Sequence, residues 1–437
     1  MKITIMGAGS TVFTKNVLGD VMLTPSLCEC EIALYDIDGA RLHESKLVVD
    51  ALNAKYNENR ARVSTYLGVE NRKDALRNAD FVIDTIQVGL YDPCTILDFE
   101  IPKKYGLRQT IGDTLGIGGI FRGLRTIHVL RDFAADIEEV CPNAWFLNYT
   151  NPMAILSGYM QRYTKVKTVG LCHSVQVVAK RCMEHLGMDY SRHGHSLVAG
   201  INHMAWLLEI YDKDGNDLYP EIRERAKTVN DTKHDDMIRM EYLKNFGYYV
   251  TESSEHNAEY NPFYIKSKYP ELIERYNIPL DEYPRRCVKQ IAGWEARRDK
   301  ILGGEGLEHK RSLEYASYIM EAMVTDTPYQ IGGNVLNHGL IPNLPANACV
   351  EVPCLVNGNG IAPTYVGELP EILAAMNRTN INVQLLTIEA AVTQKREAIY
   401  HAAMLDPHTA AELSIDDIKA MCDELYEAHI AAGYPVF

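Results

Sequence analysis

The sequence predicts an α/β protein with a doubly wound parallel sheet in its N-terminal half and an α+β region in its C-terminal half. The chain begins with a short apolar run, Lys2–Met6, which leads through the turn Gly7-Ala8-Gly9-Ser10 into helical spacing. Further apolar runs alternate with amphipathic segments, as in sheets whose strands are connected by helices. After about residue 195 this alternation ends, and hairpin and helical patterns follow.

The N-terminal strands are expected at nearly continuous apolar runs, because parallel strands are buried on both faces. These runs are Lys2–Met6, Glu31–Tyr35, Phe81–Val88, Ala144–Leu147 and Val166–Leu171. The helices expected between them are Val12–Met22, Arg41–Tyr56, Thr126–Val140 and Asn151–Arg162.

The second half is expected to begin with a β-hairpin, since the run Trp206–Tyr211 precedes the turn Lys213-Asp214-Gly215-Asn216. Residues 235–300 show weak periodicity. The elements expected after them are an amphipathic helix over residues 313–323, strands at Gln330–Val335 and Ala348–Val356, and a helical tail from about Ile372 to His429.

The length of 437 residues favours two domains. We expect a nucleotide-binding domain over residues 1–195. Residues 196–437 then form an α+β domain for substrate, metal and oligomerisation. The interface between two such domains is the usual place for an active site.

The composition excludes several classes of partner. The net charge of −14 argues against nucleic acid and anionic membranes, because both require a basic surface. No apolar run is long enough to cross a bilayer, and the N-terminal run is too short for a signal peptide. Ten cysteines without a CxxC pair indicate reduced thiols, so we expect a cytoplasmic protein.

A nucleotide site is predicted at the first strand–helix turn. Gly7 and Gly9 would let a pyrophosphate approach the backbone, and Ser10 and Thr11 begin the helix whose amide groups would bind it. The third glycine of the usual fingerprint is missing, so the turn alone could be an ordinary connection. Asp36, at the end of the second strand, suits the ribose hydroxyls of NAD and would repel the extra phosphate of NADP. An exposed strand-end carboxylate is the alternative.

A second glycine-rich segment, residues 109–119, precedes the helix expected at Thr126–Val140. It suits a loop that closes over cofactor and substrate, and otherwise it is an ordinary connection.

Cys172 follows a predicted strand, and His203 follows a later β run. Ligands of open parallel sheets bind beyond the carboxyl ends of the strands. A thiolate and an imidazole with open positions suit a divalent ion such as Mn²⁺. On spacing alone, a buried thiol and a hydrogen-bonded core imidazole remain the more common arrangement.

Two further groups of polar residues are candidates for substrate contacts. Asn148 and Asn151 end a predicted strand and suit sugar hydroxyls, although Asn151 could be only a helix cap. The segment 251–260 gathers three carboxylates, an imidazole and a phenol that could supply a general base, or that could form a solvated face. Arg285 and Arg286 could bind substrate oxygens or pair with acids.

The chain resembles glycoside hydrolase family 4, and within it the α-galactosidase branch, over nearly its whole length. The segments that carry the resemblance are Gly7–Thr11, Tyr35–Asp38, Leu147–Met153, Gly170–Gln176, Gly200–Met204, Phe246–His256, Leu280–Cys287 and Asp406–Ala410.

The resemblance implies a Rossmann-like NAD domain of the lactate/malate dehydrogenase type and an unusual hydrolysis. NAD⁺ takes a hydride from carbon 3 of the sugar, and a divalent metal such as Mn²⁺ acidifies the proton on carbon 2. A base removes that proton, the aglycone leaves, water adds, and the hydride returns. The family assembles as dimers or tetramers.

The resemblance also implies roles for individual residues. Cys172 and His203 would be the metal ligands, and His173 the general acid or a substrate contact. Tyr260 and Glu255 rank slightly above Glu252 and His256 as the base. The NAD contacts would be Gly7, Gly9, Ser10, Thr11, Asp36 and Asn148. The substrate contacts would be Asn151, Asn202 and Arg286.

The expected substrate is an unphosphorylated α-galactoside such as melibiose or raffinose, because the segment Gly89–Thr95 lacks a basic residue for a sugar phosphate. Three alternatives stay open. An α-glucosidase or α-uronidase would share this chemistry, and Arg285 or Arg286 could hold a uronate carboxylate. An NAD-dependent dehydrogenase would accumulate NADH. A non-catalytic nucleotide sensor would keep the glycines and Asp36 but not need Cys172 or His203.

Overall fold

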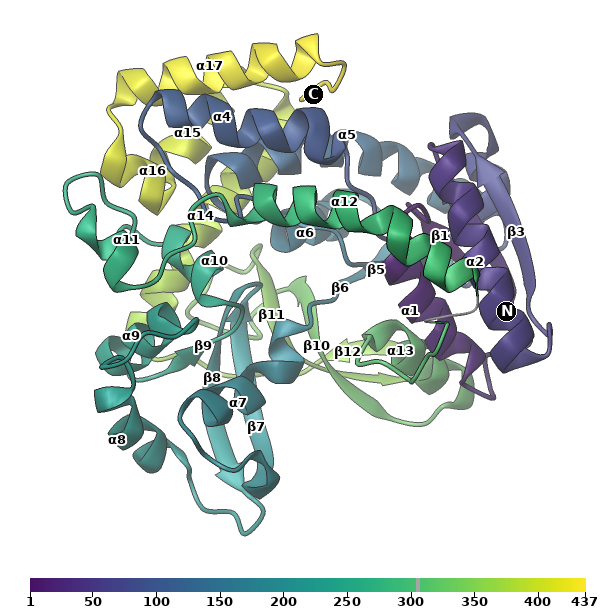
Figure 1. Ribbon diagram of the computed structural model, residues 1–437, viewed down its shortest axis with the longest axis horizontal. Coiled ribbons are helices and arrows are strands. Elements are labelled where there is room, and N and C mark those ends of the chain that lie inside the picture. Colours follow the sequence, from purple (N-terminus) through teal and green to yellow (C-terminus); the bar gives the residue numbers. More distant parts are fainter. Residues whose placement is uncertain (304–306) are drawn as a thin grey trace.

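The computed structural model of the chain describes residues 1–303 and 307–437 (Figure 1). Within these residues, twelve strands form one continuous sheet. The strands are β1 Lys2–Met6, β2 Glu31–Asp36, β3 Arg62–Leu67, β4 Phe81–Asp84, β5 Trp145–Asn148, β6 Lys167–Gly170, β7 His193–Ile201, β8 Met204–Asp212, β9 Tyr249–Val250, β10 Tyr329–Leu336, β11 Cys349–Asn357 and β12 Gly360–Pro363.

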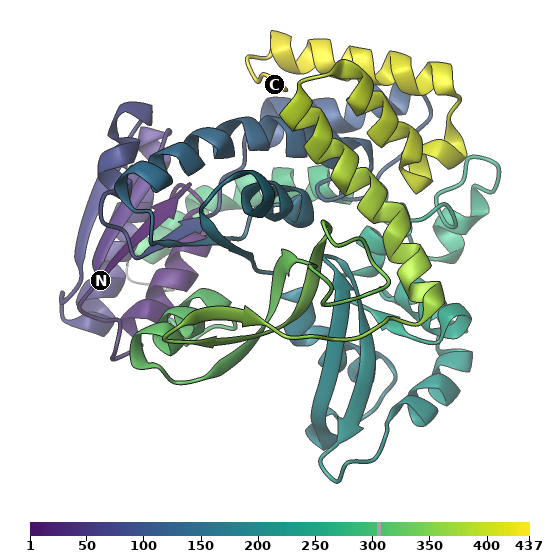
Figure 2. The same cartoon turned by 180° about the vertical axis from the view of Figure 1, so that it is seen from behind.

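The α-helices cover both faces of this sheet and its ends (Figures 1 and 2). They are α1 Thr11–Met22, α2 Gly39–Asn57, α3 Arg72–Leu76, α4 Ile96–Lys104, α5 Gly116–Val140, α6 Met153–Tyr163, α7 Ser174–His185, α8 Tyr219–Val229, α9 Met237–Phe246, α10 Ser254–Glu259, α11 Glu271–Arg275, α12 Glu282–Leu302, α13 Tyr315–Thr325, α14 Glu371–Thr393, α15 Arg396–Leu405, α16 Pro407–Glu412 and α17 Ile415–Ala431.

The parallel part of the sheet has the order β3-β2-β1-β4-β5-β6. All residues of β1 and β4 are buried, as expected for central parallel strands covered on both faces, including the polar side chains of Lys2, Thr4 and Asp84. The connections reverse direction between β1 and β4, and this is where doubly wound sheets bind ligands. The predicted doubly wound half is therefore confirmed, and the expected strand Phe81–Val88 ends at Asp84.

Antiparallel strands continue the sheet beyond β6 in the order β10-β11-β7-β8-β9. The strand predicted at Trp206–Tyr211 exists as β8, and the chain turns after it as predicted, but the main hairpin of β8 is formed with the strand before it. β8 pairs with β7, and the connecting residues are Asn202 and His203, the latter with a left-handed φ of 64°. The turn after Asp212 leads only to an isolated bridge between Tyr211 and Asp217.

The glycine-rich segment is not a loose loop. Helix α5 begins at Gly116, ten residues before the expected start, and its first turn is buried. A Cβ atom on Gly119 would lie 2.6 Å from the carbonyl carbon of Thr114, and one on Gly118 would lie 2.4 Å from the carbonyl oxygen of Gly112. Glycine is therefore required because the backbone folds back closely on the start of the helix.

The predicted helical tail consists of four helices, α14 to α17. The first break comes at Gln394, which has a left-handed φ of 55°, and Pro407 begins α16. Figure 2 shows α14 descending from the other C-terminal helices towards the antiparallel strands, where it contacts β7, while its packing against α5 and α6 joins the tail to the parallel half. No helix in residues 1–303 or 307–437 is long and apolar enough to cross a membrane.

Replacing Gly119 with Ala is predicted to lower the free energy of unfolding by about 1–3 kcal/mol, because the added methyl group has no space. Thermal or urea unfolding monitored by circular dichroism measures this change. Gly293→Ala in α12 is the matched control, since nothing lies within 4 Å of its Cβ position and alanine favours a helix. Equal stability of the two variants would contradict the close approach at Gly119.

Candidate active site

Two clefts meet beyond the carboxyl ends of the parallel strands. One has a volume of about 680 Å³ and follows the ends of β1, β2 and β4. The other has a volume of about 470 Å³ and lies between the ends of β5 and β6 and the turn between β7 and β8. Both are lined by Ser10, Thr85, Ile86 and Gln87, so a single extended ligand could occupy the two. We call them the nucleotide cleft and the catalytic cleft.

The nucleotide cleft is shaped by close backbone packing. Gly7 has a φ of +84°, and a Cβ atom there would lie 2.9 Å from the backbone nitrogen of Ile86. The amide of Gly9 donates a 2.6 Å hydrogen bond to Asp36 Oδ2. The same carboxylate accepts a bond from the amide of Asp38, which fixes its orientation at the cleft wall.

Four of the predicted NAD contacts line this cleft, and two do not. The four are Gly7, Gly9, Ser10 and Asp36. The hydroxyl of Thr11 instead contacts Ser45 inside the protein. Asn148 is buried, donates to Ser157 and accepts from the amide of Thr150. Its role in the structure is to hold Thr150, which does line the catalytic cleft.

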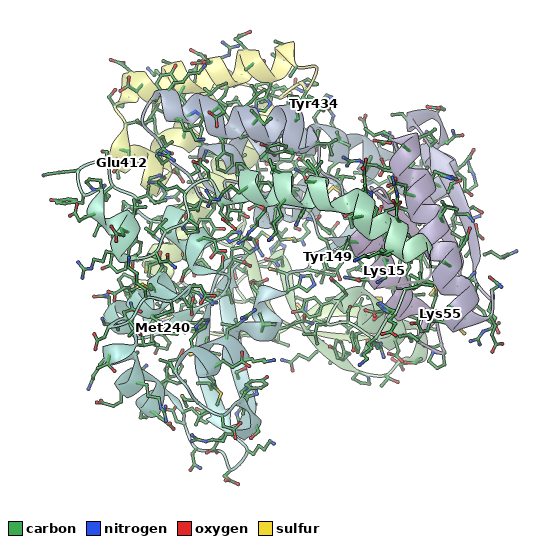
Figure 3. All side chains as sticks on the ribbon, in the orientation of Figure 1. Lys15, Lys55, Tyr149, Met240, Glu412 and Tyr434 are labelled. Carbon is green, nitrogen blue, oxygen red and sulfur yellow. The ribbon has the colours of Figure 1, made fainter. Side chains whose placement is uncertain are left out.

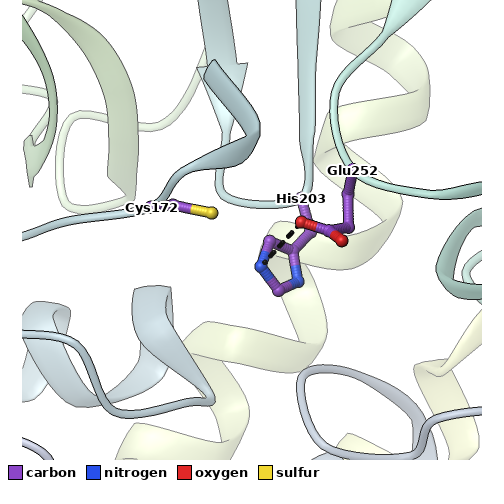
Figure 4. Close-up of side chains that lie close together, drawn as sticks. All are labelled: Cys172, His203 and Glu252. Atoms are coloured by element: carbon purple, nitrogen blue, oxygen red, sulfur yellow. Dashed lines mark ion pairs between the residues drawn. The ribbon is translucent and has the colours of Figure 1, made fainter. Parts of the chain in front are cut away.

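A thiol, an imidazole and a carboxylate converge in the catalytic cleft (Figure 4). Cys172 follows β6, His203 lies in the turn between β7 and β8, and Glu252 follows β9. One donor atom from each lies within 4.8 Å of the other two. Sequence spacing did not single out Glu252 from its neighbours. The backbone of Glu252 has a left-handed φ of 63°. This conformation depends on the folded structure and cannot be seen in the sequence.

The hydrogen bonds of His203 leave one ring nitrogen available to a metal. Nδ1 is engaged inside the protein by two hydroxyls, those of Thr114 at 3.0 Å and Tyr260 at 3.1 Å. Nε2 lies 3.5 Å from Glu252 Oε2 and is the ring nitrogen left for a metal. Burial lowers the pKa of His203, which keeps the ring in the neutral form that binds metals.

The thiol of Cys172 is also in a suitable environment to bind a cation. Burial raises its pKa well above the ordinary value, and the carboxylates of Glu351 and Glu252 add to the shift. An isolated thiol in this position therefore keeps its proton. A divalent cation reverses that preference, because thiolate is the form that coordinates metals. One thiolate, one imidazole and one carboxylate thus fit an ion that keeps open coordination positions for a substrate.

Further polar side chains complete the catalytic cleft. Asp113 accepts a 3.3 Å bond from Asn151, and His256 Nε2 lies 3.8 Å from Asp113 Oδ1. The guanidinium of Arg122 donates to the carbonyl of Asn151 and to the hydroxyl of Tyr283. Asp113 and Arg122 were not expected from the sequence, since they belong to the segment interpreted as a loop and to a helix without a motif.

His173, the predicted acid, lines the catalytic cleft and is paired with Glu314. Its Nε2 lies 2.6 Å from Glu314 Oε2, and this hydrogen bond raises the pKa of the imidazole. Glu314 precedes α13, 141 residues away in the chain, and no local pattern marked it.

The remaining predicted residues do not line the catalytic cleft. Tyr260 is completely buried, and its hydroxyl lies 3.1 Å from His203 Nδ1. Asn202 is also completely buried, and its side chain interacts with the carboxylate of Glu351. Glu255 and Arg286 form an ion pair with each other, and Arg286 also binds Glu282 within α12. The sequence predicted that both residues contact the substrate or its reacting atoms. In the structure the two charges neutralise each other.

Comparison with known proteins agrees with this architecture. The profile of the family 4 glycosyl hydrolases matches residues 2–188, and that of their C-terminal domain matches residues 198–409. The chain belongs to glycoside hydrolase family 4. It is 62% identical to the α-galactosidase of Bacillus subtilis (strain 168), covering 98% of each chain. It is 35% identical to the α-galactosidase of Rhizobium meliloti (strain 1021), covering 98% of this chain and 88% of that one.

Solved structures of the family share the fold. A putative glucosidase from Bacillus subtilis superposes with a TM-score of 0.87 at 23% identity, covering 97% and 99% of the two chains. A 6-phospho-α-glucosidase from gut microorganisms, solved in complex with NAD and Mn²⁺, superposes with a TM-score of 0.80 at 21% identity, covering 98% of each chain. A lactate dehydrogenase from Eimeria maxima superposes with a TM-score of 0.50 at 15% identity, covering 90% of this chain and 96% of that one. The predicted dehydrogenase-like fold class is therefore confirmed.

Replacing Cys172 with Ser is predicted to weaken Mn²⁺ binding at least about 100-fold, since loss of a ligand exceeds the 10–100-fold effect of losing an outer-shell partner. Equilibrium dialysis with metal analysis measures this. Cys182→Ser, at a free buried thiol outside the cleft, is the matched control and should bind as the unmodified protein does. Equal losses in the two variants would mean that the effect comes from the fold and not from the metal site.

Proposed function

We propose that this chain is an NAD- and divalent-metal-dependent α-galactosidase that hydrolyses unphosphorylated α-galactosides such as melibiose and raffinose. The observation that carries the proposal is the set Cys172, His203 and Glu252 at the junction of a nucleotide cleft and a catalytic cleft. The 62% identity to an α-galactosidase over nearly the whole chain supports the choice of substrate.

In this proposal NAD occupies the nucleotide cleft, with Asp36 on the ribose hydroxyls and the backbone at Gly7 and Gly9 against the pyrophosphate. The metal, Mn²⁺ or another divalent ion, is held by Cys172 Sγ, His203 Nε2 and a carboxylate oxygen of Glu252. When bound, the nicotinamide accepts and returns a hydride at carbon 3 of the sugar, and the metal polarises the neighbouring hydroxyls.

His173 acts as the general acid in this proposal. Nε2–H donates to Glu314, and this contact raises the pKa of the imidazole. It therefore favours the imidazolium, in which Nδ1 also carries a proton that can pass to the leaving oxygen. After that transfer the neutral ring keeps its Nε2–H on Glu314, as a carboxylate orients a catalytic imidazole.

For removal of the proton from carbon 2, we favour His256, because Glu252 is assigned to the metal. The His256 imidazole lines the catalytic cleft, with its Nδ1 3.6 Å from Glu252 Oε1. Tyr260 and Glu255, the first candidates from the sequence, are less suitably placed. The hydroxyl of Tyr260 contacts His203, and Glu255 is bound to Arg286.

Among the described residues lining the catalytic cleft, Arg122 is the only Lys or Arg side chain. Its guanidinium is already bound to Asn151 and Tyr283. A sugar phosphate would need cations free to bind it, so this lining favours an unphosphorylated substrate. Asn151 and Asp113 provide amide and carboxylate groups for sugar hydroxyls.

We expect the enzyme to act in the cytoplasm as a homodimer or homotetramer. The ten free, buried thiols suit a reducing compartment. The oligomeric state remains a prediction from the family resemblance.

The first test is release of p-nitrophenol from its α-galactoside after chelation and removal of bound nucleotide. Activity should return only when NAD⁺ and Mn²⁺ are added together, without accumulation of NADH, because the hydride returns in each turnover. The α-glucoside and α-galacturonide serve as alternative substrates. Activity without either addition would exclude this mechanism, and NADH accumulating without p-nitrophenol would indicate a dehydrogenase.

Replacing Asp36 with Ala is predicted to raise the Kd for NAD⁺ about tenfold or more, because hydrogen bonds from ribose hydroxyls to a carboxylate each contribute about 1.5–3 kcal/mol. The preference for NAD⁺ over NADP⁺ should fall at the same time, since repulsion of the extra phosphate is lost. Calorimetric titration measures both constants. Asp50→Ala, on α2 and paired only with Lys46 among described residues, is the control. An unchanged preference would assign the ribose to another residue.

A further inference from the structure

The C-terminal tail of the chain forms part of the wall of the nucleotide cleft. Gly433, Tyr434 and Pro435 line it, although they are more than 420 positions along the chain from the glycine-rich turn that also lines it. Figure 3 marks Tyr434 beside the C-terminal helices, close to the nucleotide-binding half. A Rossmann-type cleft is usually built from the strand ends and their first helices, so this contribution needs an explanation of its own.

Contacts on both sides of Tyr434 hold the tail in place. The amide of Tyr434 donates to the carbonyl of His429 at 2.9 Å, which turns the chain back at the end of α17. Val436 is 1% exposed and belongs to the apolar cluster of the C-terminal helices. The ring of Phe437 packs against Tyr426, with centroids 5.9 Å apart. The tail is therefore a packed element.

A buried ionic network links the helix before the tail to the body of the cleft. His429 Nε2 lies 2.9 Å from Asp98, which also accepts a 2.7 Å bond from Arg125. Arg125 in turn donates to the carbonyl of Val88 at 3.0 Å. Arg125 and Val88 both line the nucleotide cleft. The position of the tail is thus fixed relative to the wall that it faces.

The location of the tail identifies which half of a dinucleotide it faces. The nicotinamide end must reach the catalytic cleft, through the residues that the two clefts share. The tail lines only the nucleotide cleft, so it belongs to the adenosine half. There the cleft also presents large apolar side chains to solvent, Ile37 at 74% and Val69 at 60% exposure. Apolar groups of this kind are placed to be covered by a flat, aromatic ligand.

We infer that the C-terminal tail completes the adenine subsite and that the ring of Tyr434 packs against the adenine. This inference rests on the proposed binding of NAD. The tyrosine is half-buried in the cleft wall, and a rigid aromatic ring is suited to stacking on a purine. Gly433, with a φ of +84°, makes the turn that presents it.

The test compares Tyr434→Ala and Tyr434→Phe in the full chain by calorimetric titration with three probes: NAD⁺, ADP-ribose and nicotinamide mononucleotide. Tyr434→Ala should raise the Kd for NAD⁺ and ADP-ribose about fivefold to tenfold, as expected for the loss of one aromatic stacking contact. Its Kd for nicotinamide mononucleotide should not change. Tyr434→Phe should bind all three as the unmodified protein does. Tyr365→Ala, at a tyrosine that is 71% exposed elsewhere, is the matched control.

The outcomes separate this inference from the proposed function. If the unmodified protein binds NAD⁺ and Tyr434→Ala binds ADP-ribose equally well, the role of the tail is wrong while the function stands. Equal weakening for nicotinamide mononucleotide would likewise overturn the assignment to the adenine. Failure of the unmodified protein to bind NAD⁺ would overturn the proposed function, and this inference with it.

Discussion

The site depends on one row of residues across the sheet, in which Gly170, Asn334, Glu351 and Gly200 are paired in register from β6 through β10 and β11 to β7. Cys172 comes two residues after the first of these and His203 three residues after the last, so the row fixes the separation of the two donors. Both glycines are required, because a Cβ atom on Gly170 would lie 2.5 Å from the Met153 sulfur and one on Gly200 2.7 Å from the Ala205 backbone. Inside the row, Asn334 donates to Glu351 at 2.9 Å.

Sequence reasoning located the parts of the site that local pattern encodes. The buried strands β1 and β4 and the position of Asp36 at the end of β2 follow from burial and from helix–strand alternation. Cys172 and His203 became strong candidates only through the family resemblance. The pairing of Asn334 with Gly170 spans 164 residues, and no periodicity reports such a contact. The ion pair of Glu255 with Arg286 could not be predicted for the same reason. In a sequence, a charged residue that binds a substrate cannot be distinguished from one that pairs with another residue.

The charges around the donors explain why the catalytic cleft suits a cation. Asp113, Glu252 and Glu351 surround the thiol and the imidazoles, and Arg122 is already hydrogen-bonded. Burial raises the pKa of Glu351 to about 7, although contacts with Asn334 and Asn202 oppose the shift. Buried carboxylates of this density are costly unless a positive charge joins them. The fold thus maintains a negative pocket that a divalent ion would stabilise.

Helix α5 connects this pocket to the nucleotide cleft. Its glycine-rich first turn packs against Gly112 and Thr114, which places Asp113 at the metal site and Thr114 against His203. One turn further along, Arg122 holds the carbonyl of Asn151, and three residues later Arg125 holds Asp98 and Val88. Residues three apart share one face of a helix. The first three turns of one helix therefore support both the catalytic cleft, through Arg122, and the wall of the nucleotide cleft, through Arg125, so the groups on the two sides of the proposed reaction are positioned by the same element.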